Sequence, residues 1–409
     1  MKHLRVTAAA LAMLAGLQAY SEVQFMGWTQ SEDTGKAAMA ALAETFDGEV
    51  DLQGYAWGEI NKNYILRSRS NTLPDVGQVQ GRLLPTVAAG ASPIDLNDVI
   101  GRDKLLDMFD PGFLAMGEVN GMQVGVPWIT GTIGWVANKE VMDMAGVESV
   151  PSTIGEFKEA LEAVKAADPD SVPFGMATKN PNSILLDYLI LAWTFGADPI
   201  SADGQAQVNT PEGIAALDFM VEMVQGGLAA PEIDRPDARR LFAQGNTAFY
   251  IDAPQARSFA RNFSGRGEEI DAAVLPIAGP IANAGDTPVS IQWGHILTVF
   301  GDDNRSIDSD GIRWIMHLLA DEQLVDYAVG QSVLPATRSG QASDSVQSDS
   351  YLANWASASQ SPRRNTVASL SNASEVAAII GEEIQAAILG MKSSSEAAQD
   401  MQARLDDIL

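Results

Sequence analysis

The chain has 409 residues, carries 53 acidic against 26 basic side chains, and contains no cysteine. The lack of cysteine excludes disulfides, thiolate metal sites and a cysteine nucleophile, and a chain of this length can bury a large core without cross-links. The formal net charge of −27 argues against nucleic acid or an anionic membrane surface as a partner.

The N-terminus has the three-part pattern of a secretory signal peptide. Two basic residues precede an apolar run at 6–17, and the small residues Ala19 and Ser21 suit cleavage before Glu22. The run is too short to span a bilayer. We therefore predict a signal peptide over 1–21 and a periplasmic location. Because this segment carries two basic residues and no acid, its removal changes the net charge from −27 to −29.

The next 60 or so residues alternate between strand and helix patterns, in the order strand, helix, strand, helix, strand. The expected elements are a strand at 23–28, a helix at 36–46, a strand at 50–55, a helix at 59–68 and a strand at 73–78. This order predicts a parallel, doubly wound sheet.

The stretch 121–146 reads GMQVGVPWITGTIGWVANKEVMDMAG. It predicts a turn, a short strand, a bend rich in small residues, a second strand and a helix that opens near Lys139. Val124 and Val126 alternate as in a strand. Pro127 is expected to end the ladder, because proline has no N–H to donate.

A second α/β unit follows. Thr153 and Glu156 form a capping-box pattern, and Thr210 before Pro211 predicts another helix start. The remaining expected elements are strands at 249–252, 272–276 and 290–299, a long helix at 311–331, a surface loop at 339–347, and helices at 375–389 and 394–408.

This arrangement resembles the bacterial extracellular solute-binding proteins, the sugar-binding receptors of ABC importers. Residues 121–146 are similar to the first interdomain crossing of that family, in which an "Asn-Lys" strand end, here Asn138-Lys139, leads into a helix. Pro74-Asp75-Val76 resembles the family's third strand. The resemblance implies two α/β lobes joined by three crossing segments, a ligand cleft between them, no cofactor, and a monomer that meets the permease subunits of an importer.

The resemblance also suggests boundaries. We expect crossings at 129–131, 292–294 and 318–320. The first lobe would then comprise 22–129 plus 294–318, and the second 131–292 plus 320–409.

Candidate ligand-binding residues follow from the chemistry of sugars, which need flat aromatic faces and planar polar side chains. Four tryptophans lie at strand ends or crossings, although a core role is a substantial alternative for each: Trp28, Trp57, Trp128 and Trp293. Of these, Trp28, Trp128 and Trp293 are expected to stack on the ligand. The polar candidates are Gln78, Gln80, Asp252, Gln255 and His295, with Glu59 and Arg82 as weaker ones.

Other function classes have less support. No nucleophile elbow, P-loop or dinucleotide fingerprint occurs, and the two histidines that follow the signal peptide are distant, so neither catalysis nor a metal site is expected. We expect a binding protein for a neutral mono- or oligosaccharide. Two alternatives remain: an anionic ligand held by arginines such as Arg82, Arg257, Arg363 or Arg364, and a secreted glycosidase.

Overall fold

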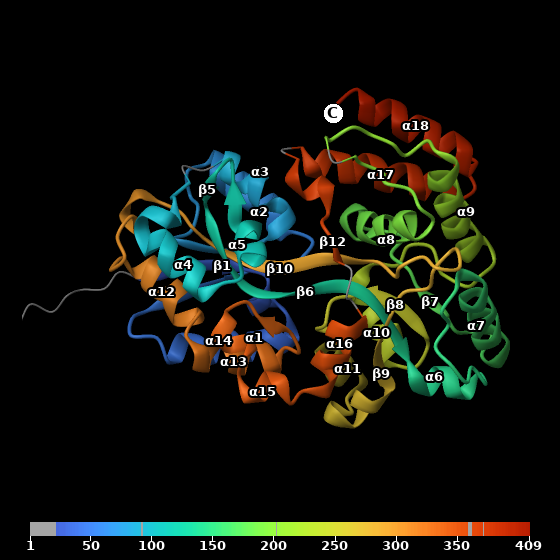
Figure 1. Cartoon of the computed structure of the whole chain (residues 1–409), viewed down its shortest axis with the longest axis horizontal. Helices are drawn as coiled ribbons and strands as arrows, with labels where there is room; N and C mark the ends of the chain where they lie inside the picture. Colours follow the sequence, from blue (N-terminus) through green and yellow to red (C-terminus); the bar gives the residue numbers. More distant parts are fainter. Residues whose placement is uncertain (1–21, 91–92, 202, 359–361, 371) are drawn as a thin grey trace, which may run out of the picture.

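The computed structural model describes residues 22–90, 93–201, 203–358, 362–370 and 372–409, so the predicted signal peptide lies outside the described residues. These residues form two α/β lobes side by side, with two long strands passing between them (Figure 1). The strands are β1 (Val23–Gly27), β2 (Val50–Gly54), β3 (Val76–Gln80), β4 (Glu118–Val119), β5 (Met122–Gln123), β6 (Gly125–Asn138), β7 (Phe174–Gly175), β8 (Phe249–Asp252), β9 (Val274–Ile277), β10 (Ser290–Val299), β11 (Leu334–Pro335) and β12 (Pro362–Arg363).

Helices cover the faces of the strands in both lobes. In the first part of the chain they are α1 (Asp33–Glu44), α2 (Ile60–Arg69), α3 (Leu84–Ala89), α4 (Arg102–Met108), α5 (Pro111–Leu114), α6 (Lys139–Met144), α7 (Ile154–Ala167), α8 (Pro181–Thr194) and α9 (Pro211–Gln225). The later ones are α10 (Arg235–Ala243), α11 (Ala256–Ser264), α12 (Asp310–Leu318), α13 (Asp321–Gly330), α14 (Arg338–Gln341), α15 (Asp344–Gln347), α16 (Ser350–Ala358), α17 (Ala373–Ile388) and α18 (Ser394–Asp406). Short turns of helix used below are η1 (Thr29–Ser31), η2 (Gly81–Leu83) and η7 (Thr366–Ser369).

One sheet runs through both lobes in the order β2-β1-β3-β10-β6-β8-β7. In the first lobe β1 pairs in parallel with β2 and β3, as the doubly wound prediction requires. β10 then pairs antiparallel with β3 on one side and with β6 on the other. β6 continues into the second lobe, where it pairs with β8 and β9. β6 and β10 are therefore the strands that physically join the lobes.

Each lobe has its own hydrophobic core, and β6 contributes to both. Trp128 lies in the first-lobe core with Phe25 and Trp314, whereas Trp135 lies in the second-lobe core with Phe157. Both tryptophans are at most 1 % exposed. Burial on this scale supplies the main favourable free energy for each lobe, and it anchors β6 at both ends.

Several predicted helix starts are confirmed. The Asn138 side chain accepts a hydrogen bond from the Val141 N–H at the start of α6. Thr153 and Glu156 form a complete capping box at α7. Such caps satisfy backbone N–H groups that a helix leaves unpaired in its first turn.

The expectation that Pro127 ends its ladder is wrong. β6 is continuous from Gly125 to Asn138 and includes this proline. The register along β10 shifts between His295 and Ile296, which pair with Ile129 and Pro127 respectively. The position left without a partner on β10 is Trp128, so the bulge interrupts the ladder beside a proline that cannot donate to it.

The expected helix at 311–331 is two helices, α12 and α13, separated at Leu319 and Ala320. Trp314 and Tyr327 pack in the first-lobe core, whereas Val325 of α13 packs in a cluster with Phe242 and Tyr250. The predicted lobe boundaries, including the crossing at 318–320, remain predictions. The expected loop at 339–347 instead contains the short helices α14 and α15.

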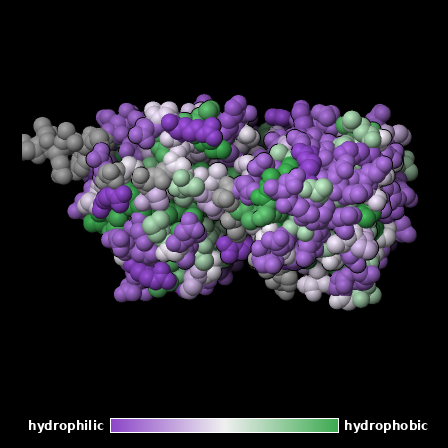
Figure 2. All heavy atoms as spheres, turned by 90° about the horizontal axis from the view of Figure 1, so that it is seen from above, coloured by the Kyte–Doolittle hydropathy of each residue, from purple (hydrophilic) through white to green (hydrophobic). Residues whose placement is uncertain are grey.

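The surface is dominated by hydrophilic residues on both lobes, with a group of hydrophobic atoms where the lobes meet (Figure 2). In the part of the chain that the structure describes, no helix combines the length and the apolar character needed to cross a bilayer.

Candidate functional site

Two cavities lie between the lobes, of about 350 Å³ and about 280 Å³. They share three lining residues, namely Ile133, Leu186 and Trp293. Trp293 is opposite Gly131 in the β10–β6 ladder. A Cβ atom on Gly131 would lie 3.1 Å from the Pro254 ring and 3.4 Å from the Trp293 ring, so the missing side chain lets the strands and the indole pack closely.

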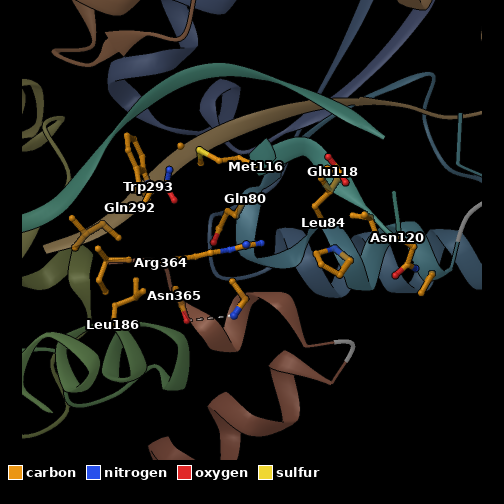
Figure 3. A pocket seen from close by; sticks show the side chains of 18 residues that line it. Gln80, Leu84, Met116, Glu118, Asn120, Leu186, Gln292, Trp293, Arg364 and Asn365 are labelled. Atoms are coloured by element: carbon orange, nitrogen blue, oxygen red, sulfur yellow. Dashed lines mark hydrogen bonds between the residues drawn. The ribbon is translucent and has the colours of Figure 1, made fainter. Parts of the chain in front are cut away.

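The first cavity opens beside η2 and η7, and its residues come from both lobes (Figure 3). Its labelled lining residues are Gln80, Leu84, Met116, Glu118, Asn120, Leu186, Gln292, Trp293, Arg364 and Asn365. Gln80 is 4 % exposed, and neither its side-chain oxygen nor its nitrogen has a hydrogen-bond partner among the described residues. An unpaired buried amide is costly, so this side chain is prepared to bind a polar ligand group.

The second cavity lies beside α1, α10 and α11. Three rings form a row along it: Trp28 meets His295 edge to face with centroids 4.6 Å apart, and Trp293 meets the same imidazole at 4.7 Å. Trp57 also lines this cavity, as do Phe259 and Phe263. The cavity therefore offers several aromatic faces beside its polar lining residues.

His295 is held by Gln78. The Gln78 Nε2–H group donates to His295 Nδ1 at 2.9 Å, so the neutral imidazole carries its proton on Nε2. The Gln78 Oε1 atom accepts from the N–H groups of Trp28 and Thr29, both at 3.2 Å. Burial lowers the pKa of His295 to about 3. The ring is therefore neutral at physiological pH, and Nε2–H forms no hydrogen bond with the described residues.

Two ion pairs stabilise the wall of the second cavity. Arg239 donates from Nε and Nη2 to the two oxygens of Asp252, at 2.7 Å and 2.9 Å. The same guanidinium lies over the Phe259 ring, 3.8 Å from its centroid. Deeper in the lobe, Arg235 pairs with Asp187 at 2.5 Å and also donates to the carbonyl of Ile251. Bidentate pairs of this kind are geometrically precise.

Six of the ten predicted binding residues line the cavities: Trp28, Gln80, Asp252, Gln255, Trp293 and His295. The Gln255 side chain is 5 % exposed and makes no hydrogen bond with the described residues. Asp252 differs from the expectation, because Arg239 and the Ala253 N–H already occupy its oxygens. The ligand contacts of these six residues remain predictions.

Three of the other four do not line the cavities. Trp128 is fully buried and stacks on Tyr327, with ring centroids 4.3 Å apart, so the expected stacking face is covered by protein. Gln78 is fully buried and uses its amide within the protein. Glu59 is exposed at the start of α2 and lines neither cavity. The Arg82 side chain lies outside the described part of the structure.

Several cavity residues were missed. Glu32 and Asp33 follow β1 after a short turn, so the rule that ligands meet the carboxyl ends of strands could have found them. Arg239 lies in α10 and Leu186 in the apolar α8, where nothing in the sequence distinguishes them from other helix residues. Arg364 lines the first cavity, although sequence analysis listed it only as one of several arginines.

Two arginines of the anionic-ligand alternative are occupied elsewhere. Arg257 pairs with both oxygens of Asp349, at 2.8 Å and 2.5 Å. Arg363 pairs with Asp198 at 3.0 Å and lies over Trp193. Neither lines a cavity between the lobes.

The comparisons with known proteins agree with this architecture. A family model described as "Bacterial extracellular solute-binding protein" matches residues 37–354. A protein of Brucella abortus described as a binding protein is 23 % identical over 314 residues, which are 75 % of this chain and 73 % of that protein.

Two solved structures have the same fold. The maltose-bound MalE3 of T. maritima is 20 % identical with a TM-score of 0.82, over 95 % of this chain and 100 % of that chain. The GacH receptor of Streptomyces glaucescens, solved unliganded and with acarbose, is 19 % identical with a TM-score of 0.82, over 95 % and 99 % of the two chains. With the family model covering most of the sequence, the chain belongs to the bacterial extracellular solute-binding protein family.

Proposed function

We propose that this protein captures a mono- or oligosaccharide outside the cytoplasm and delivers it to the permease subunits of an ABC importer. The family is one of binding proteins, and the similar structures include a maltose complex and an acarbose complex. The signal-peptide pattern at 1–21 supports a periplasmic location. The protein acts without a cofactor and as a monomer.

The observation that carries the proposal is the position of Trp293 between two cavities, each of which has a planar amide without a hydrogen-bond partner among the described residues. The indole borders both cavities, Gln80 lines the first and Gln255 the second. An aromatic face suits the C–H surface of a sugar ring, and an amide can donate to one hydroxyl while it accepts from its neighbour.

Capture would proceed by closure of the lobes around the ligand. η2 of the first lobe contacts η7 of the second beside the first cavity, and α1 contacts α11 beside the second. Contacts on both sides of the cleft support a closed arrangement in which a ligand is enclosed. Ligand contacts with both lobes would shift the equilibrium towards this form, because only differential affinity can move a conformational equilibrium.

The glycosidase alternative requires two carboxyl groups with separate roles. Glu32 and Asp252 line the same cavity, but both oxygens of Asp252 are hydrogen-bonded to Arg239. A carboxylate held in this way is a poor nucleophile or base, so a binding role is better supported than hydrolysis.

The anionic alternative rests on Arg364. This side chain lines the first cavity, extends into it on the side of Gln80 (Figure 3), and forms no ion pair with a described residue. Glu118 lines the same cavity, so its described charged lining residues are one acid and one base. We therefore favour an uncharged group in the first cavity.

Native mass spectrometry of freshly purified protein tests the proposal directly. A saccharide should appear as a fixed added mass that is lost on denaturation, and calorimetry with the identified sugar should give saturable binding. A product assay with the same sugar should find it unchanged. Purified protein that binds no saccharide in a broad library, or that cleaves its ligand, would contradict the proposal.

A further inference from the structure

The second cavity contains an unbalanced set of charged side chains. Every arginine that lines it has a carboxylate partner: Arg235 with Asp187 at 2.5 Å, Arg239 with Asp252 at 2.7 Å, and Arg240 with Asp237 at 3.7 Å. Glu32 and Asp33 line the same cavity, yet their carboxylates form no hydrogen bond or ion pair with the described residues. If both are ionised, the cavity has two uncompensated negative charges.

Of the two acids, Glu32 shows more clearly that the cavity lacks a counter-charge. It precedes α1, and its side chain accepts no capping hydrogen bond from the N-terminal N–H groups of that helix. Burial raises the pKa of Glu32 to about 7, the guanidinium of Arg239 opposes this rise, and the carboxylate of Asp252 adds to it. The protein thus leaves this carboxylate without a sufficient counter-charge.

The groups that face Glu32 come from several elements. Asp33 begins the adjacent helix α1, and Arg239 and Asp252 approach from α10 and β8. Tyr327 on α13 has a raised pKa, mainly through burial and in part through the charge of Glu32, and His295 on β10 is neutral. Because Arg239 is committed to Asp252, the balance of charge around Glu32 stays negative.

Independent features of the cavity also point to a ligand. His295 and Gln255 are 1 % and 5 % exposed, both line the cavity, and neither the imidazole Nε2–H group nor the Gln255 amide has a partner among the described residues. The aromatic rings of Trp57 and Trp293 border the same space. Aromatic faces attract cations through their quadrupole, and the attraction grows when water is excluded.

We propose that the second cavity binds the protonated amine of an amino sugar, with Glu32 as its counter-ion and the tryptophan faces around it. This inference rests on the proposed function and narrows it to a substrate class. His295 and Gln255 would bind the neighbouring hydroxyl groups, while the first cavity would hold an uncharged part of the same ligand.

The test compares matched saccharides that differ in one substituent. Each set contains a neutral sugar, the corresponding amino sugar and the corresponding uronate, as monosaccharides and as α- and β-linked disaccharides of glucose and galactose. Thermal shift identifies the set that binds, and calorimetry measures its three affinities. A charge-assisted contact predicts that the amino member binds about tenfold or more tightly than the neutral one at about pH 7.

The charge of Glu32 makes this preference dependent on pH. Because its pKa is about 7 in the free protein, the carboxyl is mostly protonated at about pH 5, while the amine stays protonated. Affinity for the amino sugar should therefore fall about tenfold or more from about pH 7 to about pH 5, whereas that for the neutral sugar should hardly change.

A matched pair of variants locates the effect. Glu32→Gln should remove most of the amine preference and its pH dependence, while Glu44→Gln, an exposed change on the same helix outside both cavities, should retain them. A neutral sugar or uronate that binds at least as tightly as its amino counterpart would overturn this inference and leave the proposed function intact. If no saccharide binds, both fail.

Discussion

Gln78 and Gln80 are the same residue type, two positions apart on β3, but their side-chain amides differ in hydrogen bonding. The Gln78 amide is fully engaged with Trp28, Thr29 and His295. In the part of the chain that the structure describes, the Gln80 amide has no hydrogen-bond partner on either atom. The sequence predicted both as ligand-binding residues, because it shows which residues end a strand but not how neighbouring strands use their hydrogen bonds. We therefore expect Gln78 to position His295 and Gln80 to bind the ligand.

Gln78→Met should destabilise the protein by about 2–4 kcal/mol, because it leaves two buried N–H groups and His295 Nδ1 without partners. Gln80→Met should leave the free energy of unfolding within about 1 kcal/mol of the parent, since it removes a buried amide that has no partner, but it should weaken ligand binding. Chemical denaturation and calorimetry measure the two effects. Equal loss of stability in the two variants would contradict the distinction.

The tautomer of the His295 imidazole also distinguishes the roles of Gln78 and Gln80. In the parent, the ¹⁵N shifts of His295 should correspond to a neutral ring protonated on Nε2. Gln78→Met should allow the other tautomer, whereas Gln80→Met should not. His317 is the only other histidine that follows the predicted signal peptide, so His317→Gln assigns the signals. An unchanged tautomer in Gln78→Met would show that another group positions the ring.

Trp293→Ala should weaken ligand binding by about 1–3 kcal/mol, the scale of a lost aromatic contact together with its buried area. The indole borders both cavities and also packs against both lobe cores, so some loss of stability is expected as well. Trp128→Phe, a change in the core, should alter stability without a comparable loss of affinity. Calorimetry with parallel thermal unfolding separates the effects, and an unaltered affinity in Trp293→Ala would remove this residue from the site.

At the scale of elements, local patterns predicted most strands and many helix starts. β10 has the bounds expected from sequence, and the caps at Asn138 and Thr153 are present. The predictions were wrong where contacts with distant parts of the chain, and not the local sequence, determine where an element begins or ends. Pro127 continues a strand because the neighbouring ladder changes register there, and the break at 319–320 carries no glycine or proline. The crossing expected at 318–320 stays a prediction, since apolar periodicity does not tell which core a helix joins.

The buried pair Arg235–Asp187 links α10 to α8, and Arg235 also reaches β8 through the Ile251 carbonyl. Arg235→Met should destabilise the second lobe by about 3–5 kcal/mol, because Asp187 would remain as a buried charge without its partner. The double change Arg235→Met with Asp187→Leu should recover most of the loss. Urea denaturation of the three proteins provides the measurement, and a double variant as unstable as the single one would show that the ion pair itself is required.

At the scale of the whole molecule, closure around a ligand should reduce the radius of gyration by a small amount. β6 and β10 are continuous between the lobes, so the change should come from bending at these strands without loss of secondary structure. Small-angle scattering with and without the saccharide, together with far-UV circular dichroism, checks both parts. A scattering profile that is identical at saturating ligand would contradict a hinged receptor.

The distribution of tryptophans gives the protein a built-in optical signal. Of its eight tryptophans, six are at most 5 % exposed: Trp28, Trp128, Trp135, Trp193, Trp314 and Trp355. The other two, Trp57 and Trp293, are partly exposed and line the cavities. Trp28 also lines the second cavity, so emission from the other five buried tryptophans should be nearly constant, and a change in intrinsic fluorescence during a titration would report on the cleft itself. The native protein could thus serve as its own label-free sensor for its solute.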